Sequence, residues 1–158
     1  MDNIDKGNLS YRESVIGITI DNLNNFLLIQ SIFYTGDEWR FPGGGVKDGE
    51  EPGLALMREL EEELGTSNFD VIGKSKYKGQ YDWPDNIILS EYHKNKVMWR
   101  GQKQAQYLVK FIGKKKDIKP NPDEIREVKW VGLEELAQHL IFPGQWDNTK
   151  KVIKELMG

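Results

Sequence analysis

Residues 44–66 read GGVKDGEEPGLALMRELEEELGT, a glycine-rich loop that leads into a glutamate-rich segment. Pro52 stands where a helix would begin, because proline suits the first helical position. Gly65 stands where the helix would end, because glycine tolerates the left-handed conformation that follows a last turn. At helical spacing the apolar positions share one side: Leu56, Met57, Leu60 and Leu64. The stretch therefore predicts a loop followed by a short helix that packs on a core.

Three glutamates fall on another side of the same predicted helix. Glu59, Glu62 and Glu63 are spaced i, i+3 and i+4, so their carboxylates emerge close together and repel one another. Helical spacing alone leaves a solvated acidic face as the alternative. A chain with no cysteine and two histidines offers mainly oxygen ligands, which suit Mg²⁺ or Mn²⁺. Such an ion can bind phosphate oxygens and acidify water, while a free carboxylate accepts a proton.

The fixed positions of this stretch resemble the Nudix box. Five residues separate Gly44 from Glu50, and seven residues separate Glu50 from Arg58. From Arg58 the pattern continues with Glu59, Leu60, any residue, Glu62, Glu63, any residue and Gly65. Thr66 stands where the family usually has an aliphatic residue. The resemblance implies that Glu59, Glu62 and Glu63 bind metal. It also implies that Arg58 braces the loop through Glu50.

Within that family, several short segments are similar to the branch of RNA 5′-pyrophosphohydrolases and dinucleoside-polyphosphate hydrolases. They are Tyr11-Arg12, the run WRGQKQ at 99–104 with the aromatic strand after it, and Lys129-Trp130-Val131. The resemblance implies that Glu124 is a further metal ligand or the base. It also implies that Arg12 and Lys103 lie near phosphates. Tyr107, on the same strand face as Lys103, is assigned with them to substrate binding.

The chain departs from that branch at three places. Gly43 replaces a usual glutamine, residues 30–33 lack a usual basic side chain, and residues 141–146 (IFPGQW) lack a usual Phe-Lys pair. Phe142 or Trp146 is left to stack on a base. These departures keep open both an RNA 5′ end and a dinucleoside polyphosphate as substrate.

The remaining chain predicts alternating strands and helices in one domain, 1–158. Strands are expected at 15–20, 26–29, 69–77, 104–112 and 124–131, and helices at 133–140 and 147–156. Residues 79–101 are interpreted as a hairpin whose aromatic side chains cap the core or form a substrate wall. The pattern indicates an α/β protein, and the resemblance implies the Nudix α/β/α sandwich with a central mixed sheet.

Composition and charge limit the classes of partner and the cellular location that the sequence predicts. The net charge of −3 gives no overall attraction to nucleic acid, and no DNA partner is expected. No apolar run is long enough to span a membrane, and the first ten residues lack the core of a signal peptide. The lack of cysteine fits a reducing compartment, so we expect a cytoplasmic protein. The sequence does not predict an oligomeric state.

These observations favour a metal-dependent hydrolase that cuts a phosphoanhydride bond in a nucleotide-bearing substrate. Glu59, Glu62, Glu63 and Glu124 would hold Mg²⁺, with Mn²⁺ as a substitute, and Glu62 or Glu124 would be the base. One alternative is a pyrophosphatase of nucleoside-diphosphate sugars such as ADP-ribose. The other is a nucleotide- or RNA-binding module that has lost catalysis.

Overall fold

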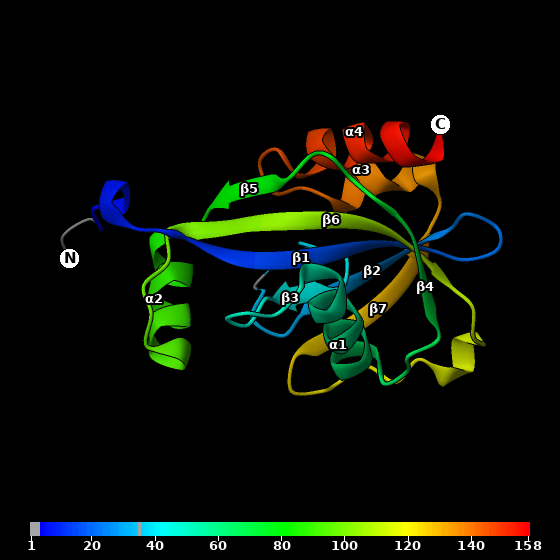
Figure 1. Cartoon of the computed structure of the whole chain (residues 1–158), viewed down its shortest axis with the longest axis horizontal. Helices are drawn as coiled ribbons and strands as arrows, with labels where there is room; N and C mark the ends of the chain where they lie inside the picture. The colour runs from blue at the N-terminus through cyan, green and yellow to red at the C-terminus, as the bar shows by residue number, and fades with distance from the viewer. Residues whose placement is uncertain (1–3, 35) are drawn as a thin grey trace.

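A computed structural model describes residues 4–34 and 36–158, and this part of the chain contains a seven-stranded mixed sheet (Figure 1). Five strands run in the order β4-β6-β1-β2-β7, while β3 pairs with β1 and β5 pairs with β6. β1 and β6 are parallel and the other pairs are antiparallel. The bounds are β1 Tyr11–Ile20, β2 Phe26–Ser31, β3 Gly43–Gly45, β4 Phe69–Lys74, β5 Gly79–Asp82, β6 Gly101–Phe111 and β7 Ile125–Val131.

Helices lie on both faces of this sheet and at one of its ends (Figure 1). They are α1 Pro52–Leu64, α2 Asp85–Asn95, α3 Leu136–His139 and α4 Gln145–Met157, with 3-10 turns η1 Lys6–Asn8, η2 Lys115–Asp117 and η3 Leu133–Glu135. Figure 1 shows α1 on one side of the sheet and α3 with α4 on the other, which confirms the predicted α/β/α sandwich. Within the described ranges, each helix is too short or too polar to form a transmembrane span.

Side-chain alternation along the central strands builds two cores. On the α1 side, Val15 packs in a cluster with Leu56 and Leu60. On the opposite side, Ile16 packs in a cluster with Leu136 and Val152. Adjacent residues of β1 therefore serve opposite cores, as period-two geometry requires. Full burial of a leucine such as Leu60 contributes about 2–3 kcal/mol.

Both predicted ends of α1 are confirmed. Pro52 is the first helical residue, and Gly65 ends the helix in the left-handed conformation with φ 72°. Glu51 caps the N-terminus, because its carboxylate accepts the N–H groups of Gly53 and Leu54 at 2.9 and 3.0 Å. These caps fix where the glutamates of α1 stand relative to the loop before it.

The hairpin predicted for residues 79–101 is wrong. The chain forms β5, then helix α2, and enters β6 at Gly101. The helix escaped detection because it buries one residue, Ile88, and so carries almost no apolar period. The strand predicted for 69–77 ends at Lys74, and Gly43–Gly45 forms a strand that the sequence pattern did not indicate.

Candidate active site

Arg58 connects the glycine-rich loop to α1. Its Nε and Nη2 donate to the two oxygens of Glu50, each at 2.9 Å, which confirms the predicted pair. Nη1 donates to Glu59 Oε1 at 2.9 Å and Nη2 to the carbonyl of Gly45 at 3.0 Å. Hydrogen bonds from Arg58, followed by the N–H of Lys47, lower the pKa of Glu50 to about 2. The guanidinium of Arg58 thus fixes both the loop and Glu59, the first glutamate of the row formed by Glu59, Glu62 and Glu63.

Glu59 lies directly over Gly44. A Cβ atom on Gly44 would overlap the Glu59 carboxylate, so only glycine leaves room for this side chain. Burial raises the pKa of Glu59, and the hydrogen bond from Arg58 opposes that rise. The glycine at this position therefore lets a largely buried carboxylate lie against the backbone of the loop.

Glu63 is the most deeply placed of the three, at 2% exposed. Its Oε2 accepts from Arg40 Nη2 at 2.6 Å, and its Oε1 accepts from the N–H of Gly43 at 2.8 Å. Burial raises the pKa of Glu63, while the charge of Arg40 lowers it. Both oxygens of this carboxylate are held before any ligand is added.

Arg40 is a residue of the site that the sequence analysis missed. A signal was available in the run Trp39-Arg40-Phe41, where a cation stands between two large aromatic residues. In an extended segment, Arg40 must face away from Trp39 and Phe41, which are buried at 8% and 2% exposure. That alternation would have turned one cation toward the α1 side of the sheet.

Glu62 and Glu124 are less constrained. The side chain of Glu62 is 50% exposed, and its nearest cation is Arg58 Nη1 at 3.3 Å. Glu124 precedes β7 in a loop tied to α1, since Asn121 donates its N–H to the carbonyl of Glu63 at 2.9 Å. The charge of Glu124 contributes to the raised pKa of Glu63 after burial. The structure thus brings all four predicted acidic residues to the same end of α1.

The carboxylate oxygens of the four glutamates are the kind of ligand that a hard divalent ion prefers. Glu59, Glu62, Glu63 and Glu124 offer oxygen alone, and repulsion among them is what a bound cation would relieve. Among the described residues, no three acidic or histidine side chains converge as a ready-made ion cage. We attribute this to Arg58 and Arg40, which hold Glu59 and Glu63 in separate hydrogen bonds.

The predicted substrate residues do not lie on one face. Arg12 stacks on Trp99, with its guanidinium carbon 5.3 Å from the ring centre, and its guanidinium fills the space beside Gly45. Lys103 alternates in phase with Tyr107 on the α1 side, whereas Arg12 is in phase with Ile16 on the other side. Tyr107 is 4% exposed within the α1-side core, so we assign it to the core rather than to substrate binding.

Of the two aromatic residues considered for base stacking, Phe142 is linked to the site through Tyr34. Its ring packs edge-on against Tyr34 at 5.3 Å between centres. Burial raises the pKa of Tyr34, and the charges of Arg40 and Glu63 also act on its hydroxyl. Phe142 is 36% exposed and so presents part of its ring to solvent.

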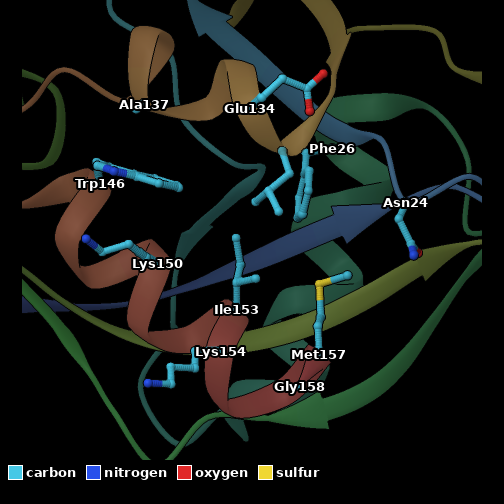
Figure 2. Close-up of a pocket in the computed structure, with 11 residues that line it drawn as sticks. Asn24, Phe26, Glu134, Ala137, Trp146, Lys150, Ile153, Lys154, Met157 and Gly158 are labelled. Carbon is cyan, nitrogen blue, oxygen red and sulfur yellow. The ribbon is translucent and has the colours of Figure 1, made fainter.

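Trp146 lies elsewhere, in an apolar groove of about 630 Å³ between α4 and η3 (Figure 2). Phe26, Ile153 and Met157 line the same groove, and Glu134 is the one acidic side chain among its lining residues. In Figure 2 the charged ends of Lys150 and Lys154 point away from the apolar residues. This cavity therefore lacks the paired carboxylates and cations of the site on α1, and we assign no chemistry to it.

Comparison with protein families matches residues 10–155 to the NUDIX domain. The chain is 35% identical to the RNA pyrophosphohydrolase of Rickettsia conorii over 150 residues, which cover 93% of this chain and 90% of the relative. It is 36% identical to the RNA pyrophosphohydrolase of Rickettsia prowazekii over 151 residues, with the same coverage. These matches span the glycine-rich loop, α1 and the loop of Glu124.

Solved structures share the fold at low sequence identity. The E. coli dihydroneopterin triphosphate pyrophosphohydrolase superposes with a TM-score of 0.70 at 16% identity, covering 94% of this chain and 98% of that one. A C. elegans Ap4A hydrolase binary complex superposes with a TM-score of 0.66 at 19% identity, covering 92% and 98%. At these identities the likeness concerns the arrangement of the sheet and its helices.

Proposed function

The chain belongs to the Nudix family and is a Nudix hydrolase, and we propose that it hydrolyses a phosphoanhydride bond at the 5′-triphosphate end of RNA. The observation that carries this proposal is the row Glu59, Glu62 and Glu63 beside the clamp made by Arg58 and Glu50. Nudix hydrolases generally need divalent metal ions, and the all-oxygen donor set favours Mg²⁺, with Mn²⁺ as a substitute. Relatives that cover 93% of the chain and are named RNA pyrophosphohydrolases support the RNA substrate.

Each acidic residue has a distinct proposed part. Glu59 and Glu63, both largely buried, would hold the ion together with Glu62 and Glu124. When bound, the ion would neutralise phosphate charge and make water more acidic. Glu62, half exposed and weakly held, is the carboxylate most free to take the proton of the attacking water. As the water oxygen bonds to phosphorus, the P–O bond of the anhydride breaks and its electrons leave with the departing phosphate.

Two cations would bind the phosphate chain. Arg12 is held by Trp99 beside Gly45, one residue from the glycine that contacts Glu59. Lys103 is in register with Glu13, two residues from the β1 partner of Gly44. These two positive side chains would approach the glutamate row from opposite faces of the sheet. Phe142 would supply a ring on which the first base stacks.

A dinucleoside polyphosphate is the second candidate substrate. No lysine follows Phe142, since residues 143–146 read PGQW, so one cation expected near an RNA backbone is missing. A second nucleoside carries less charge than an RNA chain and would need fewer cations. A panel of 5′-triphosphate RNA, diadenosine tetraphosphate and ADP-ribose separates the candidates. Faster cleavage of ADP-ribose than of the other two would contradict both proposals, and binding without turnover on all three would indicate a non-catalytic module.

Conservative variants test the assigned roles. Glu62→Gln and Glu63→Gln should each lower kcat by about 100-fold or more with Mg²⁺ present, because each removes a charge used in the reaction. Glu61→Gln is the matched control, since Glu61 lies on the same helix and is exposed away from the row. Near-normal turnover by both Glu62→Gln and Glu63→Gln would show that the row does not carry the chemistry.

A further inference from the structure

Both the main chain and the side chain of Arg40 are held by hydrogen bonds. Its backbone N–H donates to Ile29 at 2.9 Å, and its carbonyl accepts from Ile29 at 2.8 Å. Its Nη1 donates to the carbonyl of Phe41 at 3.0 Å, and its Nη2 donates to Glu63 at 2.6 Å. Main chain and guanidinium are both fixed, so the positive charge of Arg40 is held at one place beside Glu63.

Glu63 has little freedom to accept an ion in this arrangement. One oxygen accepts from Arg40 and the other from the N–H of Gly43, and the residue is 2% exposed. Each carboxylate oxygen keeps a second lone pair. A divalent ion placed on that lone pair would nevertheless lie next to the guanidinium, and like charges at that range repel strongly.

We propose that Arg40 is a positioning residue that takes the place of the metal at Glu63 in the ion-free enzyme and thereby weakens metal affinity. The inference rests on the metal site proposed above. Ion binding would draw Glu63 Oε2 away from Arg40 Nη2, while Gly43 keeps Oε1 in place. Arg40 thus keeps a buried carboxylate paired when no ion is present and sets the ion concentration at which the site fills.

Arg58 does not have the same effect on the ion. It holds Glu50 with two hydrogen bonds and the carbonyl of Gly45 with another, so it can release Glu59 and still be paired with a carboxylate. Among the described residues, the carboxylate that pairs with Arg40 is Glu63 alone. Release of Glu63 therefore leaves Arg40 without a carboxylate, and this opposes loading of the ion.

The direct test measures Mn²⁺ affinity without substrate, by electron paramagnetic resonance of free Mn²⁺. Arg40→Gln should bind Mn²⁺ about five- to tenfold more tightly than the wild type, because a repelling charge is removed. The same variant should unfold at a lower temperature in EDTA, since Glu63 then stays buried without its partner. Unchanged or weaker Mn²⁺ affinity in Arg40→Gln would overturn the proposal.

Two controls separate charge from structure. Lys115→Gln removes a lysine that pairs with another largely buried carboxylate, Asp21, at 3.0 Å, and should leave Mn²⁺ affinity within twofold of wild type. Arg40→Lys keeps the charge and should restore wild-type affinity within twofold, although it loses the forked geometry. Tighter binding in Arg40→Lys equal to that in Arg40→Gln would contradict a role for the charge.

A measurement on the unmodified protein covers the case in which Arg40→Gln does not fold. Nitrogen NMR of arginine side chains during a Mg²⁺ titration should show the Arg40 signals shifting and exchanging faster with water as Glu63 is withdrawn. An unaltered Arg40 signal at saturating Mg²⁺ would refute the inference. If the wild type binds no Mn²⁺ at all, the proposed function fails. If it binds and Arg40→Gln binds no more tightly, the role of Arg40 alone fails.

Discussion

Helices α1 and α2 differ in what holds them against the sheet. α1 buries five of its thirteen residues: Ala55, Leu56, Leu60, Glu63 and Leu64. Glu51 caps its start, Gly65 ends it, and Arg58 and Arg40 connect its glutamates to the strands before it. Several independent contacts therefore fix the helix that carries the proposed chemistry.

α2 buries Ile88 alone and lacks a side-chain cap at its start, where Pro84 stands. Lys96, the capping residue that follows Asn95, adopts φ 63°, a conformation that costs a non-glycine residue energy. Figure 1 shows α2 at one end of the sheet, apart from α1. The comparison teaches that the glutamates stand on the more constrained of these two helices, whereas α2 belongs to the part of the molecule expected to open locally.

Removal of Arg58 should strongly lower both turnover and stability. In Arg58→Gln, Glu50 and Glu59 lose their shared cation, and the carbonyl of Gly45 loses a donor. We expect kcat to fall by about 100-fold or more and the free energy of unfolding to fall by about 2 kcal/mol. Urea unfolding in EDTA and steady-state turnover measure the two losses. A variant that keeps wild-type stability would show that the packed face of α1 suffices without the clamp.

A methyl group on Gly44 should separate catalysis from stability. In Gly44→Ala the new Cβ overlaps the Glu59 carboxylate, which must then move out of the row. We expect kcat to fall by about tenfold or more, while the free energy of unfolding changes by about 1 kcal/mol. Gly73→Ala is the matched control, because its Cβ would meet Leu156 at an ordinary distance of 3.5 Å. Equal turnover in both variants would indicate that Glu59 need not lie against the loop.

The same contrast explains which parts of the site could be predicted from sequence. The ends of α1 and the pair Arg58–Glu50 depend on residues at most eight positions apart, so residue spacing revealed them. The pair Arg40–Glu63 joins residues 23 positions apart, and spacing along one helix gives no information about it. Only the path of the chain between β2 and α1 brings these two side chains together.

The two missed elements have their own physical reasons. α2 has one buried residue, so no helical period is visible in its apolar positions. β3 consists of three glycines, a composition that carries no strand preference, and pairing with β1 imposes its extended form. The assignment of Tyr107 to substrate failed for a related reason. Strand alternation gave its face, but only the packed α1 above that face shows that it is covered.

Acidification should weaken the attachment of the loop to α1. The pKa of Glu50 is lowered to about 2 from an ordinary 4.5, chiefly by hydrogen bonds from Arg58. A carboxyl group whose pKa is lower in the folded than in the unfolded protein stabilises the fold at any pH above the unfolded-state pKa. This contribution disappears as the pH falls toward the folded-state pKa. Glu50→Gln should therefore unfold at a lower temperature than wild type at pH 7, with a gap that narrows between pH 5 and 3. A gap that stays constant across this range would mean that the loop is held by contacts other than this charge pair.

Truncation of Ile88 should have the smallest effect on global unfolding and on turnover. If α2 opens before the sheet unfolds, its contacts contribute nothing to that later transition, and Ile88→Ala shifts it little. Amide hydrogen exchange in residues 85–95 should instead accelerate by about tenfold or more. Leu60→Ala, which truncates an equally buried residue of α1, should lower the free energy of global unfolding by about 3 kcal/mol. If both variants lose the same global stability, α2 is as firmly part of the cooperative unit as α1, and the distinction between the two helices is wrong.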